Sequence, residues 1–363
     1  MSLAPNPVDL LARARADLRM GVPVVLVEGE AGVLAAAVEA LDAPRLAEIR
    51  ALDGTPVVVI SARRAETLKA RAYDGDLARI VLPADADHAW VHSVADPADD
   101  LEKPMKGPLM SERDGHAALH RLAMQVTKSA QMLPAAMVVA LPDARGFALA
   151  HGLTVLEASE TLPHLELNSP MHSVVSARLP IEVSDLGRLH VFRPDDGGEE
   201  HYAIEIGSPP RDAPVLSRLH SACFTGDVMG SLKCDCGPQL RAALAQMGEE
   251  GHGVLLYLNQ EGRGIGLANK MRAYSLQDQG FDTVEANHRL GFEDDERDFR
   301  IGADILRRLG FSAVRLLTNN PGKIEMMSAN GIDVAERVPL KVGENPKNAA
   351  YLATKAKKSG HLL

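Results

Sequence analysis

Short apolar runs that alternate with helix-like stretches constrain the fold of this chain more than any other feature. In the first half, the runs lie at 23–29, 55–61, 78–83 and 135–141. They are joined by Ala-rich and Leu-rich stretches, such as GVLAAAVEALDAPRLAEIRAL, for which we expect helix. Apolar runs of this length alternating with helical patterns are typical of a mixed α/β domain.

A change in the pattern after about Met171 indicates a second domain. The runs RLHVFRP and EEHYAIEIG alternate apolar and polar residues and are separated by the turn-rich PDDGG. Strand-like GVLLYL at 253–258 and AVRLLT at 313–318 follow. Because 363 residues suffice for two domains of ordinary size, we predict an α+β (mixed α/β) protein with domains 1–173 and 174–363.

Composition and charge exclude several classes of protein. Hydrophobic residues make up 46%, and no stretch approaches the roughly 18 apolar residues of a membrane-spanning helix, so we expect no membrane partner. The net charge of -10 argues against a general nucleic-acid binder. The start, MSLAPNPVDL, lacks the pattern of a secretory signal, and three close cysteines cannot pair off completely. We therefore expect a cytoplasmic protein.

All three cysteines fall within fourteen positions, as Cys223, Cys234 and Cys236. Three thiolates at this spacing can fill three corners of a tetrahedral zinc site, and an open fourth corner distinguishes a catalytic zinc from a structural one. A neighbouring side chain can also close the shell, and His220 is the obvious candidate. The alternative is a set of inert buried thiols, because free cysteine is a common small apolar core residue.

The position of these cysteines before a predicted helix favours metal binding. The helix is expected from Gln239 onwards, with Pro238 at its first position and Gly251 after its last turn. Thiols at a helix N-terminus meet the positive end of the helix dipole. This lowers their pKa and favours the thiolate that binds metal.

A glycine-rich segment, NQEGRGIGLANKMRAY, follows the predicted strand 253–258. A strand, a glycine-rich turn and a helix N-terminus present several backbone N–H groups that can hold an anion. A tight connection is the alternative, since the spacing fits neither the Rossmann nor the Walker pattern. Glu261 and Arg263 add a carboxylate that suits guanine and a guanidinium that suits phosphate.

Two more polar clusters stand next to predicted helices. GFEDDERDF at 291–299 precedes the helix IGADILRRLG, and most such runs are solvated turns that complement the helix dipole. TNNPGK, from Thr318 to Lys323, follows the strand 313–318. A turn between a strand end and a helix start is a ligand-binding position, although Lys323 can equally be a solvated side chain.

Taken together, these motifs resemble the GTP cyclohydrolase II family over about 190 residues, from SARLPIE at 176 to the C-terminal HLL. The matching motifs are RLHSACFTGD, SLKCDCGPQL, QEGRGIGL, YSLQDQGFDTVEAN, DDERDF, LLTNNPGK and TKAKKSGHLL. The resemblance implies a catalytic domain at 174–363, with a mixed sheet and flanking helices. It also implies hydrolysis of GTP to 2,5-diamino-6-(5-phosphoribosylamino)pyrimidin-4(3H)-one, formate and pyrophosphate, the first step of riboflavin biosynthesis, in a homodimer.

The resemblance also implies the metals and the reacting residues. The three cysteines would bind one Zn²⁺, with a water at the fourth position that attacks C8 of guanine. Asp295 is the implied proton acceptor, and Arg297 is the implied nucleophile towards the α-phosphorus. A purely electrostatic role for Arg297 remains open, because guanidinium normally stays protonated. Tyr274 would assist ring opening, and Mg²⁺ would accompany the pyrophosphate chemistry.

The remaining implied roles are contacts with GTP. The residues are Arg218, Leu219, His220, Ser221, Gln239, Glu261, Gly262, Arg263, Thr283, Thr318 and Lys323. His220 then becomes a substrate contact beside the metal. Ala222 and Asn259 depart from the family pattern, which has Glu and Arg or His at these positions. These departures affect fine substrate contacts and rate, whereas the reaction class is unaffected.

The first half resembles the dihydroxybutanone-phosphate synthase domain through RADLRMGVPVVLVEG, VVVISARRAETLKA and MLPAAMVVAL. Its metal loop would need several carboxylates, but VEGEAGVLAAAVEALD offers only Glu28 and Glu30 before an expected alanine-rich helix. We predict that 1–173 is non-catalytic and serves stability, dimerisation or regulation. The alternatives are a bifunctional enzyme that also makes dihydroxybutanone phosphate from ribulose 5-phosphate, a non-catalytic GTP-binding regulator, and an enzyme acting on another nucleotide.

Overall fold

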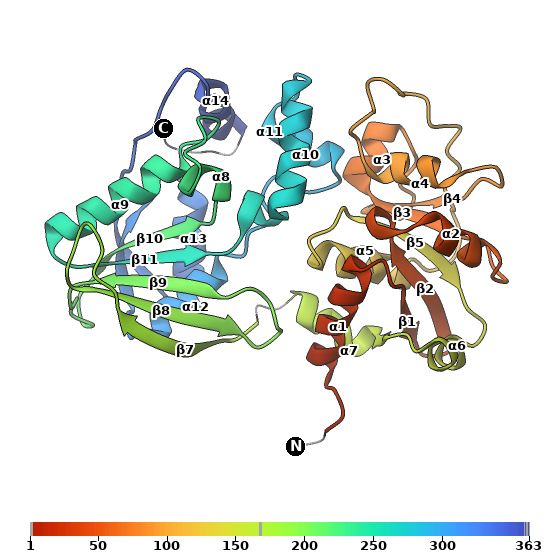
Figure 1. Ribbon diagram of the computed structural model, residues 1–363, viewed down its shortest axis with the longest axis horizontal. Helices are drawn as coiled ribbons and strands as arrows, with labels where there is room; N and C mark the ends of the chain where they lie inside the picture. The colour runs from red at the N-terminus through yellow and green to blue at the C-terminus, as the bar shows by residue number, and fades with distance from the viewer. Residues whose placement is uncertain (1–2, 167–168, 359, 361, 363) are drawn as a thin grey trace. The chain divides into compact units, whose positions relative to one another are not determined.

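The computed structural model describes residues 3–166, 169–358, 360 and 362, and it divides the chain into two compact units. The first unit comprises Met1–Leu167 and Ala268–Glu296, and the second comprises Asn168–Leu267 and Arg297–Leu363. Each unit contains one β-sheet with helices (Figure 1). The predicted mixed α/β class is confirmed. The two compact units do not coincide with the predicted domains 1–173 and 174–363, because residues 268–296 pack with the N-terminal half. The extent of the catalytic domain remains a prediction.

A six-stranded sheet in the order β4-β3-β5-β2-β1-β6 forms the first unit. Its elements are α1 (Pro7–Arg19), β1 (Val24–Glu28), β2 (Ala31–Ala37), η1 (Val38–Ala40), α2 (Ala43–Arg50), β3 (Val57–Ser61), α3 (Ala62–Leu68), β4 (Leu77–Val81), α4 (His88–Ala95), α5 (Ala118–Ser129), β5 (Ala135–Ala140), α6 (Ala144–His151), β6 (Val155–Glu157), α7 (Ala158–Glu166), α11 (Thr283–Arg289) and nearly all of α10 (Gly266–Asp278). Neighbouring strands are antiparallel except for the parallel pair β1 and β6. Most strand residues are buried, which explains the continuous apolar runs.

The first part of the Ala-rich segment is strand β2, so the prediction of a helix is wrong there, whereas α2 confirms it for the second part. Gly29 adopts a φ of +59°, so β1 turns directly into β2, and Glu28 pairs with Ala31. A Cβ on Gly32 would stand 2.1 Å from the Cβ of Ala144 in α6. Small side chains are therefore needed where β2 passes under this helix, and this tertiary contact overrides the helix propensity of alanine.

A seven-stranded sheet in the order β13-β12-β10-β11-β9-β8-β7 forms the second unit. Its elements are β7 (Met171–Arg178), β8 (Gly187–Pro194), β9 (His201–Ile206), β10 (Val215–Ser221), α8 (Phe224–Asp227), α9 (Cys236–Glu250), β11 (Gly253–Leu258), η2 (Glu261–Gly264), α12 (Arg300–Arg308), β12 (Ala313–Leu317), α13 (Pro321–Ala329), β13 (Asp333–Val338) and α14 (Ala349–Lys358). Strands β10 to β13 are mutually parallel, whereas β7, β8 and β9 pair antiparallel. The carboxyl ends of the parallel strands therefore meet at one edge of the sheet.

Two helix starts in the second unit differ from their predicted positions. Helix α9 begins at Cys236, so Pro238 is its third residue; its missing N–H costs nothing there, because the first four N–H groups of a helix lack partners. Helix α12 begins at Arg300, and its N-cap residue, Phe299, makes no side-chain cap, whereas Asp298 of the acidic run accepts the N–H of Arg300 at 2.9 Å. Residues 359, 361 and 363 of the motif TKAKKSGHLL lie outside the described residues. In the part of the chain that the structure describes, no helix is long and apolar enough to cross a membrane.

Candidate metal and nucleotide site

The polar segments singled out in the sequence gather at one edge of the second sheet. Strand β10 ends at Ser221, β11 ends just before the glycine-rich turn, and β12 ends just before TNNPGK. Because these three strands are parallel, their carboxyl ends lie side by side. Ligands of open α/β sheets bind outside the carboxyl ends of the strands.

The three cysteine sulfurs lie within 4.8 Å of one another, and Cys223 Sγ is 3.7 Å from Cys234 Sγ. Tetrahedral zinc with Zn–S bonds of about 2.3 Å places two sulfurs about 3.8 Å apart, so this spacing fits zinc. Cys223 and Cys234 are buried and Cys236 is half-buried. Among the described residues, no histidine, aspartate or glutamate joins the group, including His220.

Two glycines form the cradle that holds the sulfurs. A Cβ on Gly226 would stand 2.7 Å from Cys234 Sγ and 3.0 Å from Cys223 Sγ, and a Cβ on Gly237 would stand 2.1 Å from the carbonyl oxygen of Gly226. Helices α8 and α9 therefore approach closely only because both positions lack a side chain. The cradle and the three sulfur donors together fit a zinc ion.

The neighbouring sulfurs and burial shift the pKa of Cys234. The hydrogen bond to Cys223 raises the pKa of Cys234, and burial adds to this, although Cys236 opposes it. The pKa of Cys234 is therefore raised, whereas its position before α9 predicted a lowered pKa. Crowded thiols disfavour a second negative charge, which a bound cation would compensate.

Beside the cluster, a buried network links His220 to the cysteine loop. Asp227 accepts hydrogen bonds from the N–H of Cys223 at 3.0 Å and from the hydroxyl of Tyr257 at 3.0 Å, and it pairs with His220 Nε2 at 3.0 Å. Burial lowers the pKa of His220, with Asp227 opposing the shift. Nδ1 of His220 is buried and has no hydrogen-bond partner in the structure. It therefore remains available for a ligand.

A second network connects β10 to the start of α9. Arg218 donates to Gln239 Oε1 at 2.6 Å and to the carbonyl of Leu317 at 3.2 Å, while Gln239 donates to Asp235 at 2.6 Å. Burial lowers the pKa of Arg218 to about 10. Asp235 and Gln239 also line a cavity of about 500 Å³, together with Asn319, Leu340, Lys341, Val342, Gly343, Glu344, Ala349, Leu352, Ala353 and Ala356.

Arg297, the implied nucleophile, and Lys323, an implied GTP contact, lie against the same aromatic ring. Arg297 Cζ lies 4.8 Å, and Lys323 Nζ 4.9 Å, from the centre of the Phe299 ring. Arg297 also reaches Ser221 Oγ at 3.4 Å, and Lys323 donates to the carbonyl of Leu219 at 2.8 Å. The fold thus brings together two positive charges from segments 26 positions apart in the sequence, near the end of β10.

The glycine-rich turn contacts the cysteine loop through Glu261. One oxygen of this carboxylate accepts the N–H of Phe224 at 2.6 Å, directly after Cys223, and the other accepts the N–H of Gly262 at 2.8 Å. Arg263 adopts a φ of +63°, which is unusual for a residue with a side chain. A strained backbone conformation of this kind is frequent at binding sites.

Other predicted residues at this edge have structural partners. Thr318 is buried, and its Oγ1 accepts the N–H of Asn320 at 3.0 Å. The N–H of Ala222 donates to the carbonyl of Leu258, and that of Asn259 to His201 Nδ1 at 3.0 Å. The two positions that depart from the family pattern therefore anchor the ends of β10 and β11 through their backbone.

Tyr274, Thr283 and Asp295 belong to the first unit. Tyr274 lies in α10, with Lys270 Nζ 5.7 Å from its ring centre, and Thr283 is the first residue of α11 and accepts from Gln277 at 3.2 Å. Asp295 is exposed. The structure therefore brings together the residues of the second unit that are candidates for binding the metal, the guanine base and the phosphates. Tyr274, Thr283 and Asp295 are described only within the first unit.

Several residues that hold the site were missed in the sequence. Asp227, Asp235, Phe299 and the two cradle glycines position the predicted residues, and the only local signal was the proximity of Asp227 and Asp235 to the cysteines. No rule of sequence spacing indicates that two cationic side chains pack against the ring of Phe299, because Arg297 and Lys323 come from different segments.

Comparison with known proteins agrees with this site. Residues 172–339 match the model of the family described as GTP cyclohydrolase II. The GTP cyclohydrolase-2 of Azospirillum brasilense is 42% identical over 358 residues, covering 97% of this chain and 93% of that protein. The GTP cyclohydrolase-2 of Escherichia fergusonii is 57% identical over 190 residues, covering 52% of this chain and 96% of that protein.

A solved structure is also similar at low level. It is the crystal structure of a two-domain 3,4-dihydroxy-2-butanone 4-phosphate synthase from A. baumannii, with a TM-score of 0.33 and 17% identity, covering 93% of this chain and 100% of that one.

Fold and site thus define a mixed α/β protein with a cluster of three cysteine sulfurs at the carboxyl ends of parallel strands. With the Azospirillum relative matching nearly the whole length, the chain belongs to the GTP cyclohydrolase II family and is a hydrolase of this class.

Proposed function

We propose that the protein catalyses zinc-dependent hydrolysis of GTP to formate, pyrophosphate and the phosphoribosylated diaminopyrimidine, the first step of riboflavin biosynthesis. The observation that carries this proposal is the three-sulfur cluster, which no described acidic or histidine side chain completes and which lies at the same sheet edge as the cation pair Arg297 and Lys323. An incomplete set of protein ligands is the mark of a catalytic zinc.

The residues of the second unit suit different parts of the reaction: metal binding, phosphate binding and guanine binding. The three cysteines would hold Zn²⁺, which supplies Lewis acidity for the activation of water. Arg297 and Lys323 carry the charges that suit a triphosphate, and Glu261 offers the carboxylate that suits the guanine edge. The free Nδ1 of His220 and the networked Arg218 lie on β10 between these groups.

Asp295 and Tyr274 are assigned to proton transfer and ring opening by the family resemblance, and Mg²⁺ is assigned to the pyrophosphate chemistry. Arg297 is assigned either as a nucleophile or as an electrostatic stabiliser. A homodimer and a cytoplasmic location also remain predictions; light scattering of the purified full-length chain tests the first.

Purified, zinc-loaded protein incubated with GTP and Mg²⁺ tests the proposal directly. We expect formate, pyrophosphate and the diaminopyrimidine, identified by mass spectrometry. Binding of GTP without any product would instead indicate the non-catalytic regulator, and release of formate from ribulose 5-phosphate would indicate the bifunctional enzyme. We expect no such release, because the β1–β2 turn carries only Glu28 and Glu30, both exposed.

A further inference from the structure

Residues 268–296 carry Tyr274, Thr283 and Asp295, yet they pack on the N-terminal half of the chain within the first unit. This N-terminal half has no assigned task. The contacts that hold 268–296 there are specific, charged and distributed along its whole length.

Helix α10 is held at its start and middle. Arg272 pairs with Glu39 at 3.1 Å and with Asp96 at 3.1 Å, and Asn269 donates to the carbonyl of Gln131 at 3.1 Å. Glu39 in turn accepts the N–H of Leu133 at 2.7 Å. The cation of α10 is therefore fixed between two carboxylates from different parts of the N-terminal half.

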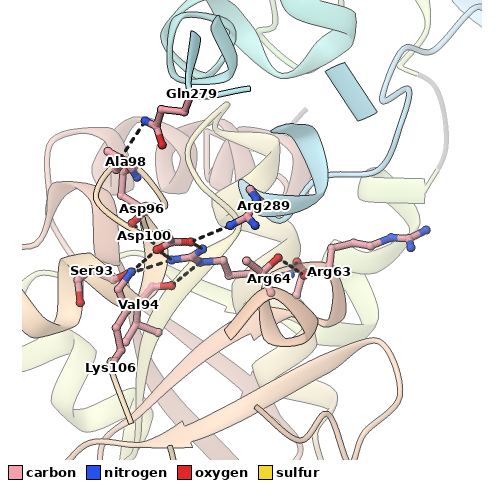
Figure 2. Close-up of polar contacts among 12 residues, drawn as sticks. Arg63, Arg64, Ser93, Val94, Asp96, Ala98, Asp100, Lys106, Gln279 and Arg289 are labelled. Carbon is pink, nitrogen blue, oxygen red and sulfur yellow. Dashed lines mark hydrogen bonds and ion pairs between the residues drawn. The ribbon is translucent and has the colours of Figure 1, made fainter. Parts of the chain in front are cut away.

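Helix α11 is held by a buried charge cluster, which Figure 2 shows. Asp100 is buried and bonds both Arg64 and Lys106. Burial would raise the pKa of Asp100, but Arg64 and Lys106 together keep it below its usual value. Arg289, at the end of α11, approaches the same carboxylate at 3.6 Å and stacks on Phe281 at 3.8 Å.

The acidic run 293–296 is held on both sides of Asp295. Arg63 on α3 forms a bidentate pair with Glu293, with contacts of 2.8 and 3.1 Å, and Lys128 on α5 pairs with Glu296 at 2.7 Å. The run is thus anchored by two N-terminal cations, rather than being a solvated turn. Asp295 itself stays exposed between these anchors.

We infer that the N-terminal half is an intramolecular positioning domain for 268–296, with Arg63 and Lys128 as the positioning residues that set the placement of Asp295. This inference rests on the proposed function. A displacement of about 1 Å of a reacting group can reduce turnover roughly 100-fold, so such anchors affect rate even when they add little to stability. The Arg63–Glu293 pair is exposed and the Lys128–Glu296 pair is half-buried. Ion pairs that remain in contact with solvent contribute little to global stability, so we expect the fold to stay intact without them.

The test is the double variant Arg63→Met with Lys128→Met in the full-length, zinc-loaded protein. We expect kcat for formate release from GTP to fall about tenfold, with zinc content unchanged, because the three cysteines lie in the second unit. Backbone amides of 283–296 should exchange hydrogen faster. Combining Arg63→Glu with Glu293→Arg should restore most of the kcat lost in Arg63→Glu alone.

Arg121→Met is the matched control. Arg121 forms a bidentate ion pair with Asp76, and both residues lie within the N-terminal half. Their side chains are 36% and 49% exposed, close to the 39% and 56% of Arg63 and Glu293. We expect its kcat to equal that of the wild type. Unchanged kcat despite faster exchange at 283–296, or an equal loss in Arg121→Met, would overturn the inference. A wild-type protein without formate release would instead refute the proposed function, and the exchange measurement alone would still decide whether the anchors hold 268–296.

Discussion

The two sheets of this protein distribute their polar residues differently, and strand direction is the reason. In the first unit, most strands are antiparallel, so their carboxyl ends alternate between two edges. Its buried charges, such as Arg64 with Asp100 and Arg79 with Asp74, bind one another. In the second unit, four parallel strands bring their carboxyl ends to one edge. Buried side-chain atoms without a partner among the described residues occur in both units, and Ser111 Oγ, His120 Nδ1 and Gln125 Oε1 are those of the first. In the second unit, Arg218 Nε, His220 Nδ1 and Gln260 Oε1 lie near the carboxyl ends of β10 and β11.

This difference indicates which half binds a ligand. Buried polar groups are normally paired, so unpaired groups collected at one edge mark a place where another molecule completes the bonding. Self-paired charges instead fix the arrangement of neighbouring segments. The paired charges of the first unit therefore fix its own segments in place. The unpaired groups at the edge of the second sheet are instead available to a ligand.

The largest expected effect comes from Cys234→Ser. Serine cannot replace a buried zinc thiolate, so zinc retention and formate release should both fall to background. Metal analysis and a formate assay measure the two. Met229→Ser removes sulfur from the same loop at an exposed position and should retain both properties. A zinc-free but active Cys234→Ser protein would contradict the assignment of the second unit as the metal-binding half.

A smaller effect is expected for Arg297→Lys. Lysine keeps the charge but loses the planar fork that binds phosphate through two hydrogen bonds, so pyrophosphate release should fall about 100-fold. Arg300→Lys is the control in the same segment, since Arg300 pairs with the neighbouring Asp298 at 2.8 Å. Complete loss in Arg297→Lys, with a trapped guanylylated protein in the wild type, would identify the covalent role, because attack on the α-phosphorus leaves the nucleoside monophosphate on the arginine when pyrophosphate departs.

Asp227→Asn, in the second unit, should lower the free energy of unfolding more than Tyr257→Phe does. The amide group cannot accept from Cys223, Tyr257 and His220 as the carboxylate does, and an unsatisfied buried donor costs about 2 kcal/mol. Tyr257→Phe removes one hydrogen bond and should cost about 1 kcal/mol. Thermal unfolding followed by circular dichroism compares the two variants. Equal destabilisation would show that the network does not depend on the carboxylate.

The smallest expected effect is a dependence of stability on pH, which one buried histidine in each unit produces. Burial lowers the pKa of His120 in the first unit to about 4 and that of His201 in the second to about 4. Between pH 6.5 and 4 the unfolded chain binds the proton and the folded chain does not, so stability is lost as pH falls. Each histidine should cost about 2 kcal/mol between pH 7 and pH 5.

Trp90, the single tryptophan of the sequence, lies in α4 and reports on the first unit. Urea unfolding followed by Trp90 fluorescence should lose most of this pH dependence in His120→Gln and should keep it in His201→Gln. Equal behaviour of both variants would show that the units unfold together.

The sequence predicted most strands, because their apolar runs are long and bounded by turn residues, as in β11 at Gly253–Leu258. It misassigned β2, because alanine has high helix propensity and the nearby α6 that demands small side chains is more than a hundred positions away. The candidate site was predicted through its motifs. The cation pair on Phe299 and the role of Asp227 were not, since both depend on the approach of separate segments.

The sequence by itself determined the mixed α/β class, the three sulfur donors and the family, because these depend on local periodicity and on residue type at fixed spacing. Only the tertiary structure decided that Gly226 and Gly237 form the cradle for the sulfurs, and that 268–296 packs with the N-terminal half. Both are consequences of close packing between distant segments. The sequence shows which side chains are present and at what spacing. Their contacts depend on how distant segments pack in the folded protein.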